Sequence, residues 1–441
     1  MNRRGWIILM VAAWLACGSG ARGESPAGEA PRPGPVFTWG GDLRLRYEYA
    51  PNVYQLNRHL DEERSYERYR PRVWTQIGPN PDVRLNARLV WEFYTWHHPD
   101  SQETFDDRQA LFDILNVQIA DVAGLPLTLT LGRQELQFGD GWLIREGTPG
   151  DGSTSYCFDA VRLSYDLKDA KTVVDAIYIQ NYSDAAKYIR PFGDDHEREL
   201  NDQNETGAVL YVTNQSLEKT RIEGYLIAKN DRATARRGND ARLYTYGGRV
   251  SGDLADHWLY AAQAALQSGR RNGERHEAYG FDGWIGYRWN DPLRNLVRLG
   301  YEYLSGDDPA DGPHTGFDTV WARHSRHSSL YENVLALEEA KARWTNLQRV
   351  NLGWACKPLK NTQLSCDYHL LLAPRNPTAP AAGFSAGGHV RGHLATARLK
   401  HVFNKHLSTY VLVERFWPGN YYTGLRDEPA TFLRCEAVVT W

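Results

Sequence analysis

Hydrophobic and polar residues alternate with a period of two along much of this chain. In the first clear segment one face carries Leu43, Leu45, Tyr47 and Tyr49, and the other carries Asp42, Arg44, Arg46 and Glu48. A period of two is typical of a β-strand, whose successive side chains point to opposite faces. A face with a charge at every position cannot line the core of a β-sandwich. The pattern therefore predicts a strand with one face in lipid and the other in water.

The alternation recurs in about eighteen segments, each near the roughly 9–11 residues that a tilted membrane strand requires. Further lipid-side positions are Tyr69, Val73, Ile77, Leu85, Ala87, Leu89, Trp91, Phe93, Val161, Leu163, Tyr165, Val297, Leu299, Tyr301, Tyr303, Val350, Leu352 and Trp354. The water-side positions of these segments are Arg68, Arg70, Arg72, Gln76, Arg84, Asn86, Arg88, Glu92, Arg162, Ser164, Arg298, Glu302, Arg349 and Asn351.

Short polar turns alternate with long connections between these segments. The expected short turns are residues 78–82, 121–126, 166–171, 214–220, 252–257, 289–294, 357–361 and 403–405. The expected long segments include residues 51–65, 137–157, 181–204, 305–341 and 373–390. Outer-membrane barrels have short periplasmic turns and long extracellular loops. We therefore predict an all-β fold, a transmembrane antiparallel β-barrel of about 18 strands with an even strand number.

The last segment supports a barrel that closes on itself. Leu433, Cys435, Ala437, Val439 and Trp441 share one face of it. A terminal amphipathic strand that ends in an aromatic residue is similar to the assembly signal of outer-membrane proteins. Pairing this strand with the first would leave no open sheet edge. An ordinary edge strand is the alternative, but it does not explain the alternation of loop lengths.

The N-terminus has the layout of a secretory signal peptide. Arg3 and Arg4 precede an apolar run over residues 6–17, and the small residues Gly18, Ser19, Gly20 and Ala21 follow it. We expect a signal peptide at 1–23, a flexible N-terminal segment at 24–36 and the barrel at 37–441. A lipoprotein site at Cys17 and an uncleaved anchor helix are the alternatives.

Composition separates a barrel from most soluble classes. Aromatic residues make up 12% of the chain, with 25 Tyr and 15 Trp, although the mean hydropathy is −0.57. Girdles of Tyr and Trp at two membrane interfaces explain this combination, and a sugar-binding β-sandwich is the alternative. Removal of residues 1–23 takes away three arginines and changes the formal charge from −3 to −6, so nothing indicates a nucleic-acid partner.

Four cysteines remain after the predicted signal peptide: Cys157, Cys356, Cys366 and Cys435. They lack metal-ligand spacing and form no dense disulfide framework. Cys356 and Cys366 flank one predicted turn, but a regular hairpin would place Cys366 opposite Leu352. We expect free, buried or lipid-facing thiols.

Several stretches together resemble the alginate-export family of outer-membrane porins. They begin at Gly41 (Gly-Asp-Leu-Arg-Leu-Arg-Tyr-Glu), at Leu129 (Leu-Thr-Leu-Gly-Arg-Gln-Glu-Leu, followed by Gly139-Asp140), at Phe158 (Phe-Asp-Ala-Val-Arg), at Leu304 (Leu-Ser-Gly-Asp, with Gly316-Phe317-Asp318 downstream) and at Phe416 (Phe-Trp-Pro-Gly-Asn-Tyr). The resemblance implies an eighteen-stranded monomeric barrel in the bacterial outer membrane. It also implies a lumen belt of Arg and Lys through which a polyuronate crosses.

The inward faces of the early strands provide candidates for such a belt. The candidate constriction residues are Arg44, Arg46, Arg70, Arg72, Arg88, Arg133, Arg162 and Arg349, with Arg46, Arg72, Arg133 and Arg162 as the leading ones. A guanidinium is permanently charged and can hold a carboxylate through two hydrogen bonds. Alternatively, each of these arginines forms an ion pair inside the wall, for example with Asp42, Glu48, Glu92 or Glu302, and adds rigidity without selectivity.

Arg133 belongs to this set through the resemblance alone. Strict alternation from Leu127, Leu129 and Leu131 would point it at lipid. A β-bulge near Gly132 would resolve the conflict.

The loops are acidic, which raises a possible metal site. Asp307, Asp308 and Asp311 form an oxygen-rich cluster of the kind that Ca²⁺ prefers, and a solvated acidic loop is the alternative. Segment 305–341 could fold over the mouth or into the lumen as a gate, and residues 330–344 have some helical character. We otherwise expect no cofactor.

Three function classes remain open. The first is a passive channel for anionic solutes or an anionic polysaccharide such as alginate, in contact with outer-membrane lipid, with a general diffusion porin as its variant. Periplasmic export components are further candidate partners, and a monomer is expected. The second is an outer-membrane hydrolase, for which only Asp367 and His369, with His389 and His393 nearby, offer polar side chains on one face. The third is a glycan-binding barrel that uses loop aromatics, namely Trp96, Trp142, Tyr156, Trp321, Tyr421 and Tyr422.

Overall fold

The computed structural model describes residues 34–441 except 61, 101, 103, 146–156, 185, 194–202, 236–237, 308–311, 323–325, 337–344 and 377–382. The predicted signal peptide, and all but the last three residues of the segment predicted to be flexible, lie outside the described residues. Residues 35–441 form one compact unit. No helix in the described ranges is both long enough and apolar enough to cross a membrane.

The unit consists of eighteen β-strands. Their bounds are β1 Val36–Ala50, β2 Arg64–Asn80, β3 Val83–His98, β4 Phe105–Ile119, β5 Leu127–Gln134, β6 Phe158–Leu167, β7 Thr172–Asn181, β8 Gln203–Asn214, β9 Thr220–Ala233, β10 Ala241–Leu254, β11 Trp258–Arg271, β12 Glu274–Arg288, β13 Leu296–Leu304, β14 Leu347–Leu359, β15 Thr362–Leu372, β16 Val390–Val402, β17 Leu407–Pro418 and β18 Ala430–Thr440. Among the described residues the helical elements are α1 Ser329–Ala336 and two 3-10 turns, Val122–Gly124 and Lys168–Ala170.

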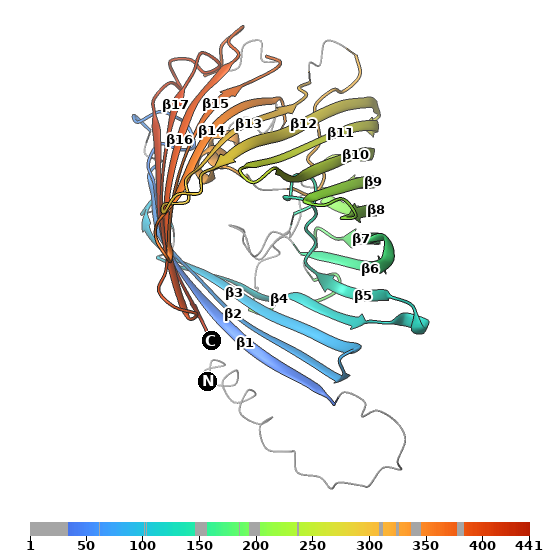
Figure 1. Ribbon diagram of the computed structural model, residues 1–441. Helices are drawn as coiled ribbons and strands as arrows, with labels where there is room; N and C mark the ends of the chain where they lie inside the picture. Colours follow the sequence, from blue (N-terminus) through green and yellow to red (C-terminus); the bar gives the residue numbers. More distant parts are fainter. Residues whose placement is uncertain are drawn as a thin grey trace, which may run out of the picture. The chain divides into compact units, whose positions relative to one another are not determined.

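Each strand pairs with its sequence neighbours, and β1 also pairs with β18. The strands follow one another around a ring in sequence order (Figure 1). At the closing seam Leu45 lies opposite Ala437, and Gly41 and Trp441 exchange two backbone hydrogen bonds of 3.2 and 3.1 Å. The predicted antiparallel barrel of 18 strands is therefore confirmed.

The two faces of the wall follow the sequence alternation. On β1, Arg44 points inward and is 1% exposed, whereas Leu45 points outward and is 37% exposed. On β10, Leu243 is 1% and Tyr244 48% exposed. Hydrophobic side chains can cover the outer face because it meets lipid instead of water.

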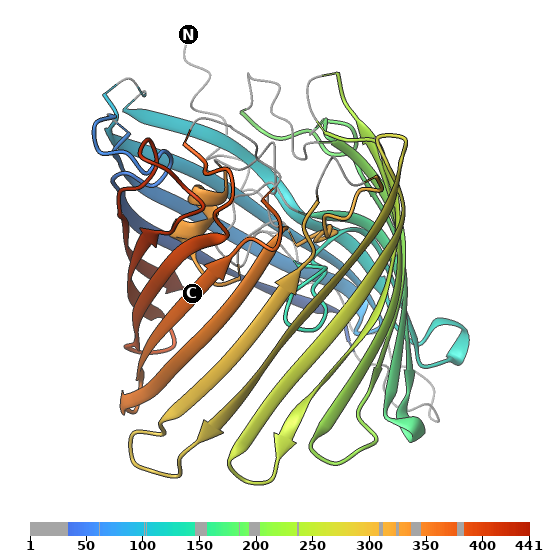
Figure 2. The same cartoon turned by 90° about the horizontal axis from the view of Figure 1, so that it is seen from above.

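Connection lengths differ between the two ends of the barrel (Figure 2). All eight expected short turns lie at one end of the barrel, where β1 begins and β18 ends. The other end carries the five expected long segments, but not every connection there is long. Asn272 and Gly273 alone join β11 to β12, and their φ angles of 51° and 88° suit a two-residue hairpin turn.

The cysteines Cys157, Cys356, Cys366 and Cys435 are free thiols, as expected. The expected register of their hairpin was wrong. Cys366 lies opposite Trp354 instead of Leu352. The reason is that β14 extends to Leu359 and β15 begins at Thr362, so the turn between them is shorter than the expected turn at 357–361.

Strand β5 leaves the wall at Arg133. Gly132 has a φ of +119°, and the pairing register runs through it without a shift on either side. The side chain of Arg133 is thus redirected by a glycine conformation and not by the inserted residue of a bulge. Beyond this point Ala110 of β4 pairs with Phe192, which occupies the place that β5 has left.

The side chains at this exit satisfy the hydrogen-bonding groups of the neighbouring strands. Arg133 is 2% exposed and donates two hydrogen bonds of 2.8 and 2.9 Å to Asp159 and one of 3.0 Å to the Phe112 carbonyl. The Gln134 side chain donates to the Ala160 carbonyl at 3.0 Å. Arg133 therefore seals the wall where β5 turns away.

We predict that Gly132→Ala destabilises the barrel by about 1–3 kcal/mol, because a left-handed or otherwise rare φ is costly for a residue with a Cβ. The added Cβ would also lie 2.5 Å from the Leu115 carbonyl oxygen. The measurement is the midpoint of urea unfolding in lipid vesicles, followed by Trp fluorescence. Gly224→Ala is the matched control, since a Cβ there has no neighbour within 4 Å. Equal midpoints for the two variants would contradict this account.

Candidate functional site

Two connections fold from the long-loop end into the lumen. Residues 135–145 continue from β5, and the described residues 305–307, 312–322 and 326–336, which include α1, follow β13. Figure 2 shows α1, in orange, inside the ring of strands. Side chains from both segments belong to one buried apolar cluster together with inward residues of the wall. The sequence left two placements open for segment 305–341, over the mouth or into the lumen, and its described residues take the second.

Aromatic side chains join the two segments to each other. The rings of Trp142 and Phe317 stack at 5.3 Å between centroids. Trp321 is 1% exposed, its backbone forms a bridge with Ile144, and its ring lies against Gly207 of β8. The two segments therefore form a single body within the lumen.

Polar side chains anchor this body to the wall. The Trp142 indole donates to Glu302 of β13 at 3.0 Å, and the Trp321 indole donates to Glu205 of β8 at 3.2 Å. Gln267 of β11 donates to the Asp318 carbonyl at 2.6 Å and accepts from the Asp318 amide at 2.8 Å. These bonds hold the segments on the side of the lumen formed by β8 to β13.

The helix α1 contacts the opposite side, at β17 and β18. Its Leu330 amide donates to Glu414 at 2.6 Å, and the Tyr331 ring lies 6.0 Å from that of Phe416. The predicted helical character of residues 330–344 is thus found at its start. Residues 337–344 lie outside the described part of the chain.

A charged cluster lies between the body and the wall. Arg326 contacts Asp140 at 3.0 Å, Asp282 at 3.1 Å and Glu302 at 2.9 Å, and Arg349 contacts Glu302 at 3.0 Å. Burial lowers the pKa of Arg326, but Asp282, Glu302 and Asp140 outweigh burial and raise this pKa above its usual value.

His327 joins the same cluster as a neutral side chain at ordinary pH. Burial, followed by the positive charge of Arg349, lowers the pKa of His327 to about 3. Its Nε2 lies 3.5 Å from Glu302.

This cluster also contains a group with metal-ligand chemistry. Ligand atoms of Asp282, Glu302 and His327 all lie within 4.8 Å of one another. Both carboxylates already receive guanidinium groups from Arg326 and Arg349, so a cation would compete with two fixed positive charges.

Of the metal cluster expected from the sequence, only Asp307 is among the described residues. It accepts a hydrogen bond of 2.7 Å from the Thr315 amide and lies 3.8 Å from Nε2 of His314. Asp308 and Asp311 lie outside the described ranges. The two contacts of Asp307 stabilise the loop itself.

A cavity of about 940 Å³ lies beside the body, against the wall formed by β12 to β18. Its charged lining is mostly basic. The nine basic residues are Arg46, Arg145, Arg249, Arg298, Arg326, Arg349, Arg398, Lys400 and Arg434, and the five acidic ones are Asp140, Asp282, Asp367, Glu414 and Glu436. Polar side chains such as Ser365 and Thr396 fill much of the remaining lining.

Most of the arginines expected at a constriction are held in ion pairs of the wall. Arg46 and Arg349 line the cavity. The contacts of the set are Arg44 with Glu92 at 3.4 Å, Arg46 with Glu436 at 2.5 Å, Arg72 with Asp42 at 2.6 Å, Arg88 with Asp113 at 2.8 Å, Arg133 with Asp159 at 2.8 Å and Arg162 with Asp175 at 2.8 Å. Arg70 is buried at 3% exposure. Ion pairing within the wall, the alternative to a role in the pore, therefore describes the arginines of the early strands well.

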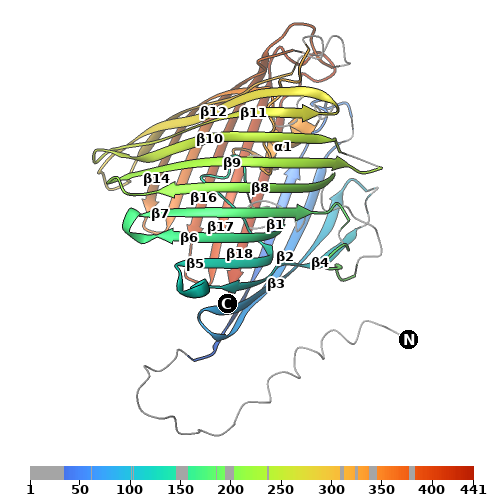
Figure 3. The same ribbon diagram turned by 90° about the vertical axis from the view of Figure 1, so that its right-hand side faces the viewer.

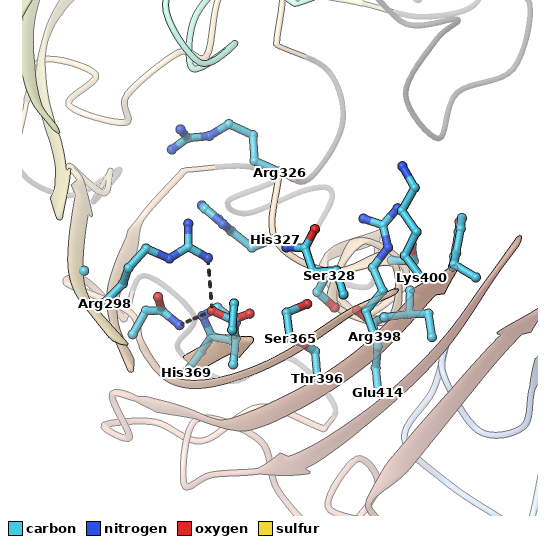
Figure 4. A pocket seen from close by; sticks show the side chains of 18 of the residues that line it. Arg298, Arg326, His327, Ser328, Ser365, His369, Thr396, Arg398, Lys400 and Glu414 are labelled. Atoms are coloured by element: carbon cyan, nitrogen blue, oxygen red, sulfur yellow. Dashed lines mark hydrogen bonds and ion pairs between the residues drawn. The ribbon is translucent and has the colours of Figure 1, made fainter. Parts of the chain in front are cut away.

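Arg398 and Lys400 were missed by the sequence analysis. They are inward, exposed side chains of β16, toward the short-turn end. Arg398 lies 4.4 Å over the Tyr410 ring, and within the described ranges neither side chain has a carboxylate partner. Both point into the pocket on one side of it, with Arg298 and Arg326 on the other (Figure 4). The alternation of Ala397 and Leu399 with these two cations was the signal that could have revealed them.

The polar residues that a hydrolase would use have partners within the barrel. His369 and Asp367 do share the inward face of β15, but His369 lies 3.4 Å from an Arg349 nitrogen, and Asp367 contacts Asn351 at 3.3 Å.

Among the loop aromatics, Trp142 and Trp321 are buried in the lumen, and Tyr421 and Tyr422 are 0% and 3% exposed. Trp96 lies against Tyr66, with 4.6 Å between the ring centroids. Tyr156 lies outside the described residues. The described loop aromatics therefore pack against the protein itself.

Comparison with known proteins gives one family and a group of similar folds. The family model described as alginate export matches residues 36–435. Three crystal structures of Pseudomonas aeruginosa porins share the fold. OccK11 (OpdR) is 11% identical, with 91% of this chain and 95% of that chain covered and a TM-score of 0.56. OprD is 10% identical, with 91% of this chain and 95% of that chain covered and a TM-score of 0.53. OccK2 (OpdF) in complex with glucuronate is 12% identical, with 91% of this chain and 97% of that chain covered and a TM-score of 0.56. No curated protein matches the sequence.

We predict that Gly207→Ala releases the lumen body from the wall. A Cβ there would lie 2.4 Å from the Trp321 ring and 2.8 Å from the Ala228 carbonyl oxygen, and such overpacking costs about 1–3 kcal/mol. We expect higher and noisier single-channel conductance in planar bilayers. Gly224→Ala serves again as the control, because it adds the same methyl group at an open position. A Gly207→Ala channel with the conductance of the unaltered chain would show that Trp321 does not hold the body in place.

Proposed function

This chain belongs to the alginate-export family of outer-membrane proteins, and from that premise we propose that its channel prefers anions and conducts an anionic polysaccharide such as alginate. The observation that carries the proposal is the excess of cations in the lumen cavity, above all Arg398 and Lys400. The proposal includes passive transport by a monomer without a resident cofactor.

The cations of the cavity fall into two groups. Arg46 and Arg349 are neutralised by Glu436 and Glu302 at 2.5 and 3.0 Å. Arg298 makes a loose contact of 3.9 Å with Asp367 and lies 5.8 Å from the centre of the Trp284 ring. Together with Arg398 and Lys400 it provides positive charge that an entering anion can use. Charged rings that line a lumen determine ion selectivity.

The spacing of these cations suits a chain of carboxylates. Arg398 and Lys400 are two residues apart on one face of a strand, about 6–7 Å along it, so two separate carboxylates can be held at once. Each uronate residue carries one carboxylate. A series of individually weak sites lets a ligand enter and leave without being trapped.

A smaller uronate is the second candidate for the transported solute. OccK2, which has the same fold, has been crystallised with glucuronate. A small-anion channel would share the selectivity proposed here and would differ only in excluding the polymer.

We predict that the reversal potential under a KCl gradient is shifted from zero toward the equilibrium potential of chloride. Ideal selectivity gives about 59 mV for a tenfold gradient, and a wet pore of this kind will give a fraction of that value. Arg398→Gln/Lys400→Gln should move the potential toward zero, because the lumen loses two positive charges that no carboxylate of the described residues neutralises.

Lys357→Gln/Lys360→Gln is the matched control, since it removes two exposed lysines, one near the end of β14 and one in the turn after it, that do not line the cavity. A cation-selective potential for the unaltered channel would overturn the proposal. An equal shift in both variants would assign the selectivity to the general surface charge instead of Arg398 and Lys400.

A further inference from the structure

A row of arginines crosses the outer face of the barrel at the long-loop end. Arg242 of β10 lies directly opposite Arg270 of β11, and Arg270 lies directly opposite Arg275 of β12. Figure 3 shows these three strands side by side. Arg232, near the same end of β9, belongs with them, because it lines the same surface hollow as Arg242 and Arg270.

These side chains point away from the lumen. Arg242 alternates with Ala241 and Leu243, which are 5% and 1% exposed on the inner face, and the side chain of Arg275 is 73% exposed. The row therefore faces whatever surrounds the barrel.

Aromatic and aliphatic side chains lie directly below the row on the outer face. Tyr244 and Tyr279, two and four residues further along β10 and β12, are 48% and 54% exposed, and Leu266 of β11 is 52% exposed. Outward tyrosines mark the boundary between hydrocarbon and headgroups. The arginine row thus lies just beyond this boundary, at the level of the headgroups of the outer leaflet.

The row is electrostatically unfavourable by itself. Side chains directly opposite on neighbouring strands have Cβ atoms about 4.5–5.5 Å apart, and like charges in this arrangement destabilise a sheet. Few carboxylates relieve it. Glu277 pairs with Arg275, and Asp240 accepts from the Ala233 amide at 3.0 Å. Arg270 donates at 3.4 Å to the Gly273 carbonyl, and in the described part of the chain neither Arg232 nor Arg242 contacts an acidic side chain.

We propose that this row, Arg232, Arg242, Arg270 and Arg275, binds the phosphate groups of a phosphorylated glycolipid in the outer leaflet. The hollow beside it, about 690 Å³ in volume, has Arg232, Arg242, Arg270 and Tyr244 in its lining and leaves room for a headgroup. Two acidic residues, Asp231 and Asp240, also line it, but Asp231 is buried against Lys229 at 3.1 Å and Asp240 accepts from the Ala233 amide. A guanidinium can hold a phosphate through two parallel hydrogen bonds, and a phosphate between two arginines removes their repulsion. The site is independent of what passes through the lumen and requires only that the long-loop end faces the outer leaflet.

The test is lipid binding to the detergent-purified full chain, followed by native mass spectrometry with bisphosphorylated lipid A. We expect one or more lipids to remain bound. Arg242→Gln/Arg270→Gln should weaken binding at least tenfold, and lipid A without its phosphates should bind the unaltered chain as weakly as this variant binds the phosphorylated form. Lys357→Gln/Lys360→Gln, at the opposite end of the barrel, should bind normally.

Two results would overturn the proposal. Equal binding by Arg242→Gln/Arg270→Gln and the control would show that the row does not recognise the lipid. Complete displacement of the lipid by millimolar inorganic phosphate would show that the site takes any free phosphate and is not a lipid site. Heat-dependent electrophoretic mobility of each variant verifies that the barrel is folded, so weaker binding cannot be assigned to misfolding.

Discussion

Backbone hydrogen bonding within a closed wall is the constraint on which the other features of this barrel depend. In hydrocarbon, an unpaired amide or carbonyl has no water to bind, so a spanning sheet must close on itself. The pairing of β1 with β18 meets this requirement. The place where β5 leaves the wall tests it most severely, and there Arg133, Gln134 and Phe192 provide hydrogen bonds to β4 and β6. Arg133, which the family resemblance assigned to the pore, thus has a structural role in the wall.

The departure of β5 also shapes the lumen. The chain beyond Gln134 turns inward and packs with residues that follow β13, and Trp142, Phe317 and Trp321 fill the lumen on the β8 to β13 side. The cavity that remains lies against β12 to β18. Charges divide in the same way. Arginines of the early strands meet carboxylates, whereas Arg398 and Lys400 face open space, and a transported anion would pass along this second wall.

Much of the fold could be predicted from the sequence, because lipid on one side and water on the other impose a period of two on every strand. Leu45 and Arg44 illustrate this rule, and the strand number and short turns follow from its repetition. Partners within the lumen were harder to predict. Asp113 meets Arg88 only because the register of β3 and β4 shifts between Arg88 and Leu89. The direction of Arg133 depends on one glycine φ angle, and the loops inside the lumen carry no periodic signal. Arg398 and Lys400 do obey the period, but the pattern does not reveal which inward cations lack a carboxylate.

We propose that Arg398 and Lys400 of β16, which have no carboxylate partner among the described residues, select a polyanion in the lumen. The most direct measurement is block of single-channel current by a polyuronate added to one side of a planar bilayer. We expect concentration-dependent block, weaker block for Arg398→Gln/Lys400→Gln, and no block by a neutral polysaccharide of equal length. Equal block by the neutral polymer, or no effect of the polyuronate at all, would contradict it.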